Sequence, residues 1–305
     1  MFKSAARTGF ALALAGLLSG CAASMSTGVT GGTARTGTPT GAVSTAPDGS
    51  MSIHLPNYAF MPTQTQTDEL QSATNILNAR CGRTYGYDFS SVVYVPQIPD
   101  WRYGVISLSY AEQNGYSLSA PTLAGMAAHP TQSDGVEQKL SAAPTAEQYA
   151  FYGLPSGRAG VYDGEKILAG GCEGWVQSQL GDPDTAEAVP EAQTIKADSF
   201  DLLDTDPTAT AASAAWSHCM AQAGYTYKTP FSPADDFNAT EAPDARSIAT
   251  ATADVRCKQA VNLVDIWQGV EARYENTQIQ KDLQVLTDQQ NAWNAVMTKV
   301  TVIVG

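Results

Sequence analysis

Five cysteines are the residues of this 305-residue sequence whose chemistry can be predicted most directly. One of them, Cys21, lies near the N-terminus, and the other four are widely spaced: Cys81, Cys172, Cys219 and Cys257. A zinc site is disfavoured because the cysteines form no Cys-x2-Cys pair and no pair of histidines lies near them in the sequence. In an exported chain, an even number of remaining cysteines predicts two disulfides.

Cys21 follows a segment with the pattern of a secretory signal peptide, which carries Lys3 and Arg7 before an apolar stretch over residues 10–18. The sequence Leu18-Ser19-Gly20-Cys21 resembles the bacterial lipobox, L-[AS]-[GA]-C, at all four positions. This resemblance implies that residues 1–20 are removed and that Cys21 carries a diacylglycerol, with or without an added N-acyl chain. No other cofactor is expected. The alternative is an ordinary signal peptide with a coincidental cysteine.

The segment after Cys21 predicts a lipidated, flexible tether over residues 21–50. Of the 29 residues from 22 to 50, 24 are Ser, Thr, Gly, Ala or Pro, and such a chain has an end-to-end distance of about 30 Å. Removal of the leader takes away two basic residues and shifts the net charge from −13 to −15. Anionic headgroups would repel such a chain, so two or three acyl chains must hold it at the membrane. The acidic charge also argues against a nucleic-acid partner.

The disulfide pairing is predicted from an internal repeat. Cys81 and Cys219 each begin the pattern Cys-x4-Gly-Tyr-x-aromatic after a helical stretch, and Gly86 and Gly224 lie where a left-handed residue ends a helix. Four cysteines allow three pairings, and the repeat favours Cys81 with Cys172 and Cys219 with Cys257. The alternative is that the two short matches are coincidental.

The periodicity of the chain predicts a mainly α-helical fold of two similar disulfide-stapled helical units, with minor β structure and a long C-terminal helix. We expect a first unit over residues 51–180, folded from about Ile53 onward, and a second over residues 197–305. An acidic linker is expected over residues 181–196. The smaller elements predicted are helices over 67–81, 105–114, 145–152 and 207–223, an extended run over 92–95 and a hairpin over 160–168. A capping box of Thr145 and Gln148 is expected at the third of these helices.

Two sets of residues are candidates for interaction. From residue 244 to about 300 the sequence contains no proline, and apolar residues recur there at heptad-like spacing. The face formed by Leu283, Leu286, Trp293 and Met297 should therefore pack against another helix, either within the chain or on a partner. In the first half, Trp101 and Tyr103 belong to a group of aromatic residues that either lines a sugar or peptide groove or forms ordinary core.

No catalytic or metal-binding residue is predicted. The sequence lacks the nucleophile elbow, the zinc-protease motif, the phosphate-binding loop and the dinucleotide-binding fingerprint. It has three histidines, and each fits a surface or loop position better than a general base. The acidic residues between 198 and 206 do not have the spacing of a calcium-binding loop, and helix capping explains them better.

The layout resembles a group of secreted lipoproteins from high-GC Gram-positive (actinobacterial-type) bacteria that has no assigned function. The residues that carry the resemblance are the lipobox, the two Cys-x4-Gly-Tyr elements, the Gly-Gly-Cys segment ending at Cys172 and the Ala-Asp-Val-Arg-Cys segment ending at Cys257. We therefore expect a non-enzymatic, lipid-anchored protein at the extracytoplasmic face of the cell membrane, with an envelope protein or transporter as a possible partner. The alternatives are a ligand-binding lipoprotein that serves a transporter and a cell-wall remodelling enzyme.

Overall fold

A computed structural model describes residues 41–90, 96, 98–128, 139–181 and 189–305. Of the described residues 64 % are helical, and this part of the chain contains two small antiparallel sheets, a long C-terminal helix and two disulfides. This is the predicted fold class. Cys21, the proposed signal peptide and the extended run over 92–95 lie outside the described residues.

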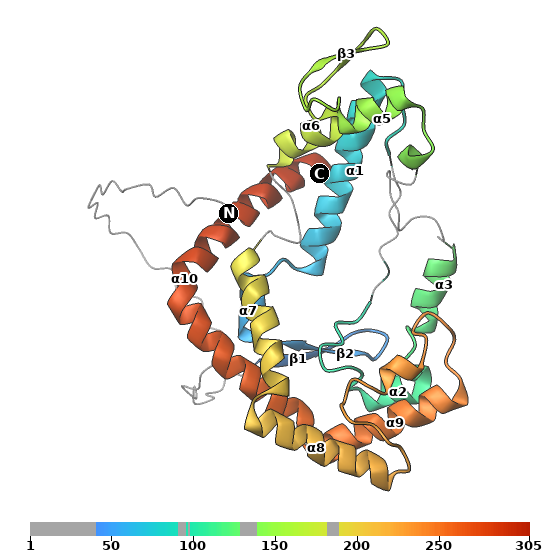
Figure 1. Cartoon of the computed structure of the whole chain (residues 1–305), viewed down its shortest axis with the longest axis vertical. Helices are drawn as coiled ribbons and strands as arrows, with labels where there is room; N and C mark the ends of the chain where they lie inside the picture. The colour runs from blue at the N-terminus through green and yellow to red at the C-terminus, as the bar shows by residue number, and fades with distance from the viewer. Residues whose placement is uncertain (1–40, 91–95, 97, 129–138, 182–188) are drawn as a thin grey trace, which may run out of the picture. The chain divides into compact units, whose positions relative to one another are not determined.

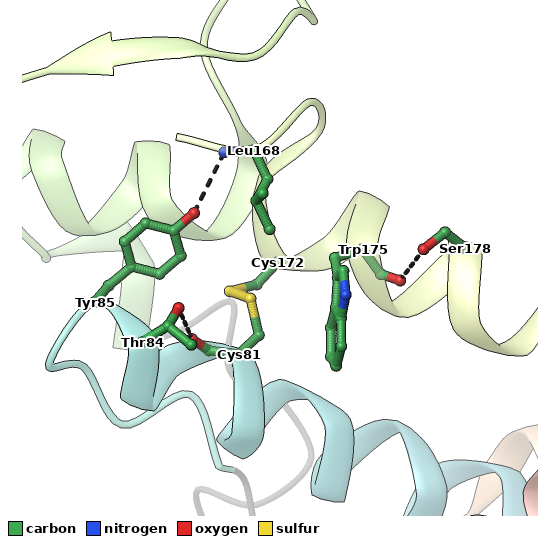
Figure 2. Close-up of a disulfide and its surroundings, with 7 residues drawn as sticks. All are labelled: Cys81, Thr84, Tyr85, Leu168, Cys172, Trp175 and Ser178. Carbon is green, nitrogen blue, oxygen red and sulfur yellow. Dashed lines mark hydrogen bonds between the residues drawn. A yellow bond between two sulfur atoms is a disulfide. The ribbon is translucent and has the colours of Figure 1, made fainter. Parts of the chain in front are cut away.

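The first disulfide joins Cys81 of helix α1 (Gln64–Thr84) to Cys172 of helix α6 (Gly171–Leu180), as predicted. Figure 2 shows this bond between the two helices, with Trp175 beside it. Helix α1 begins with a capping box of Thr63 and Gln66, a few residues before the predicted start.

Helix α1 ends in a Schellman motif. The amide of Tyr87 donates to Gly82 O at 3.0 Å, and the amide of Gly86 donates to Arg83 O at 3.3 Å. The φ angle of Gly86 is +76°, which only glycine adopts without strain.

The second disulfide joins Cys219 of helix α8 (Pro207–Gln222) to Cys257 of helix α9 (Ala245–Ala260), also as predicted. Helix α8 ends in the same Schellman motif, with Gly224 at a φ of +91° and the amide of Tyr225 donating to Met220 O at 2.9 Å. The Cys-x4-Gly-Tyr repeat is therefore a repeated helix end.

The likeness of the two units does not extend to the second cysteine of each pair. Cys172 lies at the start of α6, whereas Cys257 lies in the last turn of α9. The repeat thus describes how α1 and α8 end and not a whole duplicated unit.

Two hairpins form the β structure. Strands β3 (Gly160–Tyr162) and β4 (Glu165–Ile167) are the predicted hairpin, and both turn residues, Asp163 and Gly164, have positive φ angles as a type I′ turn requires. Strands β1 (Ala42–Thr45) and β2 (Met51–His54) form the other. The predicted tether over residues 21–50 therefore extends too far, because residues 42–45 belong to this hairpin. Their side chains are exposed, but their backbone pairs with residues 51–54.

The predicted linker over 181–196 is wrong at its C-terminal end. Helix α7 (Pro190–Asp201) starts there with proline at its first position, where the missing amide hydrogen costs no hydrogen bond. Ala192 and Ile195 of α7 are buried in the core. Residues 182–188 lie outside the described part of the chain.

The long helix predicted from residue 244 is interrupted. Asn262, with a φ of +55°, ends the first segment, so that α9 and α10 (Leu263–Val304) are separate helices. Asparagine is one of the few residues other than glycine that tolerate this conformation. Helix α10 has a kink at Asp282. The kink lies between Tyr274 and Leu283, where the heptad-like spacing of apolar residues is interrupted in the sequence.

The remaining helices are short. Helix α2 (Leu108–Asn114) ends at Gly115 as predicted but starts later than expected, with Ser107 as its cap. Helix α3 (Ala120–Ala128) was not predicted. Helix α5 (Thr145–Tyr152) has the predicted bounds, but Pro144 is its N-cap and no side chain caps it, so the capping box is absent. Two 3-10 turns, η1 (Pro56–Phe60) and η2 (Leu202–Asp204), flank α7 in the fold.

The two halves of the chain share their cores through α10. Near its C-terminus, Trp293, Met297 and Val300 pack with residues of α1 and α6. Near its start, Trp267 packs with Trp216 of α8 and with Tyr103 of the first half. Helix α10 therefore connects both disulfide-bonded parts, and its path along α7 and α1 can be followed in Figure 1.

Candidate functional site

The face of α10 that the sequence suggested for interaction is mostly core. Leu286, Trp293 and Met297 are 0 %, 4 % and 8 % exposed, and they pack against α7, α1 and α6. Leu283, which directly follows the kink at Asp282, is 51 % exposed and is not part of this buried face. Of the two arrangements expected, helix packing within the chain is the one observed.

The two aromatic candidates of the first half have different surroundings. Tyr103 is buried, and its ring packs edge-on against Trp267 with 5.5 Å between the ring centroids. It belongs to the core, one of the two roles expected for these aromatic residues. Trp101 is half-buried and is held edge-on against Tyr110 at 6.1 Å, and it lines a groove.

This groove, which we call the Trp101 groove, lies between residues 99–102 and helix α7 and has a volume of about 530 Å³. Its walls are mainly apolar: Trp101, Pro99, Ala197, Phe200 and Phe231. Its polar lining comes from Asp100, Arg102, Gln193 and Lys196. A volume of this size is typical of small-molecule sites, which combine apolar walls with a few polar groups.

Arg102 is fixed at the base of the groove. Its Nε and Nη2 bond to Glu271 Oε2, and Nη2 also donates to Lys196 O at 2.7 Å and to Ser199 Oγ at 3.0 Å. Its guanidinium carbon lies 5.1 Å from the centre of the Phe200 ring. Burial lowers the pKa of Arg102, and the hydrogen bonds and negative charge of Glu271 more than offset this, so the group stays charged.

Lys196 and Asp100 line the groove, and both contact Tyr58. The Lys196 ammonium lies 5.0 Å from the centre of the Tyr58 ring, and the Tyr58 hydroxyl donates to Asp100 Oδ2 at 2.9 Å. Burial and the neighbouring Asp100 charge raise the pKa of Tyr58 far above its usual value. Tyr58 therefore stays protonated and serves as the platform that positions both charged groups.

Two buried glutamates of α10 lie behind Arg102. Glu271 and Glu275 are both 0 % exposed, and the Ser199 hydroxyl lies within hydrogen-bonding distance of Glu271 Oε2 at 3.0 Å and of Glu275 Oε1 at 3.2 Å. The amide of Asn57 donates to Glu275 Oε2 at 2.9 Å. Burial raises the pKa of Glu275 to about 7, although the Asn57 amide and the Arg102 charge favour its ionised form.

A second buried ion pair lies outside the groove and is fully satisfied. Lys258 donates to Asp254 Oδ2 and to the carbonyls of Tyr103 and Val105, each at 3.0 Å, which uses all three of its N–H groups. Asp254 also accepts from Trp216 Nε1 at 2.9 Å and from Tyr116 at 3.1 Å. This cluster ties the segment after Trp101 to helix α9, so its role is structural.

The sequence interpretation missed the charged residues of the groove. Arg102 lies between two aromatic candidates in the sequence, and Lys196 is the last residue of the predicted linker, so neither is predicted as a site residue. One signal was available: Glu271 and Glu275 lie four residues apart on the same helical face as Trp267. Carboxylates on an apolar face predict a buried cationic partner, because an unpaired buried charge is costly. The sequence does not indicate which residue provides this cation.

The other polar candidates have ordinary roles. His54 bonds to Ser44 and His218 bonds to Gln222, both at exposed positions, whereas His129 lies outside the described residues. Among the acidic residues between 198 and 206, Asp206 caps α8, as expected, and Asp198 accepts a hydrogen bond from the Tyr274 hydroxyl at the surface. The described residues contain no cluster of His, Cys, Asp or Glu that could hold a metal ion. Within the same ranges, every helix is too short or too polar to cross a membrane.

Comparisons with known proteins give no further guidance, since no protein-family profile, curated protein or solved structure matches this chain.

Proposed function

We propose that this chain is a lipid-anchored, non-enzymatic protein of the extracytoplasmic face of a cell membrane, and that its folded part binds a small ligand in the Trp101 groove. The lipobox sequence ending at Cys21 supports the anchor. The two disulfides are compatible with an extracytoplasmic location. The observation that carries the binding role is the groove itself, in which aromatic walls surround a fixed arginine and a half-buried lysine.

A binding groove is favoured over an interaction arm because the apolar face of α10 is occupied. Leu286, Trp293 and Met297 are covered by α7, α1 and α6. The Trp101 groove, by contrast, offers half-buried aromatic rings next to charged groups, the combination by which proteins orient small ligands. A ligand held there would be available for transfer to an envelope partner such as a transporter.

The anchor is tested by fractionating cells that express Cys21→Ser. We expect this variant to leave the membrane fraction or to accumulate unprocessed, while Ser24→Ala, a matched change three residues later, stays in the membrane fraction and is processed. Normal membrane retention of Cys21→Ser would contradict the lipid anchor.

The binding role is tested by nuclear magnetic resonance of the mature lipidated protein in phospholipid vesicles, with a fragment set that contains neutral, cationic and anionic aromatic molecules. We expect fragments to give saturation transfer that Trp101→Ser reduces and Trp175→Ser, a change outside the groove, leaves unaltered. Equal signals from the two variants would place binding elsewhere, and the absence of any signal would contradict the binding role.

A further inference from the structure

The Trp101 groove contains an arginine whose hydrogen-bonding capacity is only partly used. The Arg102 side chain is 5 % exposed, and its Nε and Nη2 bond to Glu271, Ser199 and the Lys196 carbonyl. Its Nη1 makes no hydrogen bond to any described residue, although Arg102 lines the groove. A guanidinium held in place with one nitrogen unused provides two N–H donors for a bound acceptor.

Lys196 supplies a second positive charge without an anionic partner. Its ammonium rests over the Tyr58 ring and makes no ion pair with a described residue. Its own carbonyl accepts from Arg102 Nη2 at 2.7 Å, so the backbone of α7 fixes the lysine close to the arginine. Both cations therefore line the same groove in a chain whose net charge is −13.

The walls of the groove determine which kind of ligand body can bind beside these two cations. Phe200 and Phe231 lie 5.4 Å apart between ring centroids, and Trp101 lines the groove with them. Aromatic walls of this kind favour a planar, apolar ligand body. The volume of about 530 Å³ suits one or two rings with a short side chain.

The local charge balance favours a ligand with a single negative charge. The Arg102 charge is largely compensated by Glu271, and the exposed Asp100 carboxylate stands at the groove edge. A dianion would meet repulsion from both carboxylates, whereas a carboxylate needs only the Nη1 donors and the Lys196 ammonium.

From these observations we infer that the Trp101 groove recognises a small aromatic carboxylate, with the carboxylate between Arg102 Nη1 and Lys196 and the ring among Trp101, Phe200 and Phe231. The inference deepens the proposed function and rests on it.

The test measures the affinity of the mature lipidated protein, in zwitterionic phospholipid vesicles, for 3-phenylpropionate and for its uncharged isostere 3-phenylpropionamide by titration calorimetry. We expect the carboxylate to bind about tenfold more tightly, the ratio that corresponds to one partly buried ion pair of about 1.4 kcal/mol. Lys196→Met should abolish this preference, and Lys196→Arg should retain it. Lys166→Met removes a lysine of β4 that does not line the groove, and it should bind like the wild type.

Several outcomes would overturn the inference. Equal affinities for the carboxylate and the amide would refute anion recognition while leaving a binding groove in place. A preference that persists in Lys196→Met, with circular dichroism showing a native fold, would refute the role of the lysine. Inorganic phosphate that binds as tightly as 3-phenylpropionate would refute selection by the aromatic walls. Failure of both probes would overturn the inference but not the proposed function, because the proposed function is tested separately by the whole fragment set and by the Trp101→Ser and Trp175→Ser variants.

Discussion

Lys258→Met should be among the most destabilising single substitutions in this protein. The variant retains the length of the side chain but leaves Asp254, which is 0 % exposed, without its cation. It also removes the donor from the carbonyls of Tyr103 and Val105. Breaking a buried ion pair by removing one partner costs about 3–5 kcal/mol. The two buried carbonyls add to this cost, so the expected loss is at least about 4 kcal/mol.

The pH dependence of this loss identifies its cause. Burial already raises the pKa of Asp254, against the opposing charge of Lys258, and removing Lys258 raises that pKa further. A carboxyl with a raised pKa in the folded state contributes stability below its unfolded pKa and loses it as the pH rises through the folded value. The deficit of the variant should therefore be larger at pH 8 than at pH 5.

The assay is urea unfolding followed by tryptophan fluorescence at both pH values, with Arg256→Met as the matched control on the same helix. Arg256 forms an exposed pair with Glu112 at 3.1 Å, and such pairs contribute less than about 1 kcal/mol. The double variant Lys258→Met with Asp254→Leu should recover part of the stability because it leaves no unpaired buried charge. If Lys258→Met costs no more than Arg256→Met, the reasoning about the buried pair is wrong.

Three further predictions concern α10 and the first disulfide region. Glu275→Gln should flatten the pH dependence of stability. Because the pKa of Glu275 is about 7 in the folded state, the wild type should lose up to about 3 kcal/mol of stability relative to the variant as the pH rises from about 4.5 to 8. Thermal unfolding of both proteins over this pH range measures the difference. Leu286→Ala should cost about 2–5 kcal/mol and Leu283→Ala less than about 0.5 kcal/mol in urea unfolding, since only the first residue is buried; equal effects would contradict the assignment of this face to the core. Gly171→Ala should prevent native packing, because its φ is +61° and the new Cβ would overlap the Phe151 carbonyl oxygen of α5. The Cβ of Gly164→Ala would meet no atom within 4 Å, so this variant should only strain the turn. A Gly171→Ala protein as stable as Gly164→Ala would refute this reasoning.

The features predicted correctly from the sequence depend on short-range rules. A helix end needs a glycine at a fixed distance from the last turn, so Gly86 and Gly224 revealed the ends of α1 and α8 and, through the cysteines before them, the disulfides. Asp206 followed by Pro207 gave the start of α8 by the same kind of rule. Local hydrogen bonding determines such signals, and they can be recognised without knowing the tertiary structure.

The groove could not be predicted because its residues meet only in the tertiary structure. Arg102 lies 94 residues from Lys196 and 169 residues from Glu271. The break at Asn262 is not predicted from the sequence because asparagine also occurs within helices, whereas here it adopts the left-handed conformation. The start of α7 was missed because its acidic, proline-containing sequence also fits a loop.

If the chain is exported as we propose, the order of its disulfides has a consequence for their oxidation. Cys81 pairs with Cys172 and Cys219 pairs with Cys257, so each cysteine bonds to its immediate neighbour among these four. A chain that crosses a membrane from its N-terminus presents these thiols to the oxidising compartment in the same order. With Cys21 occupied by its proposed lipid, an oxidase that joins the remaining cysteines as they emerge would produce the native pairing directly, so maturation of this protein should depend on a thiol oxidase and not on a disulfide isomerase.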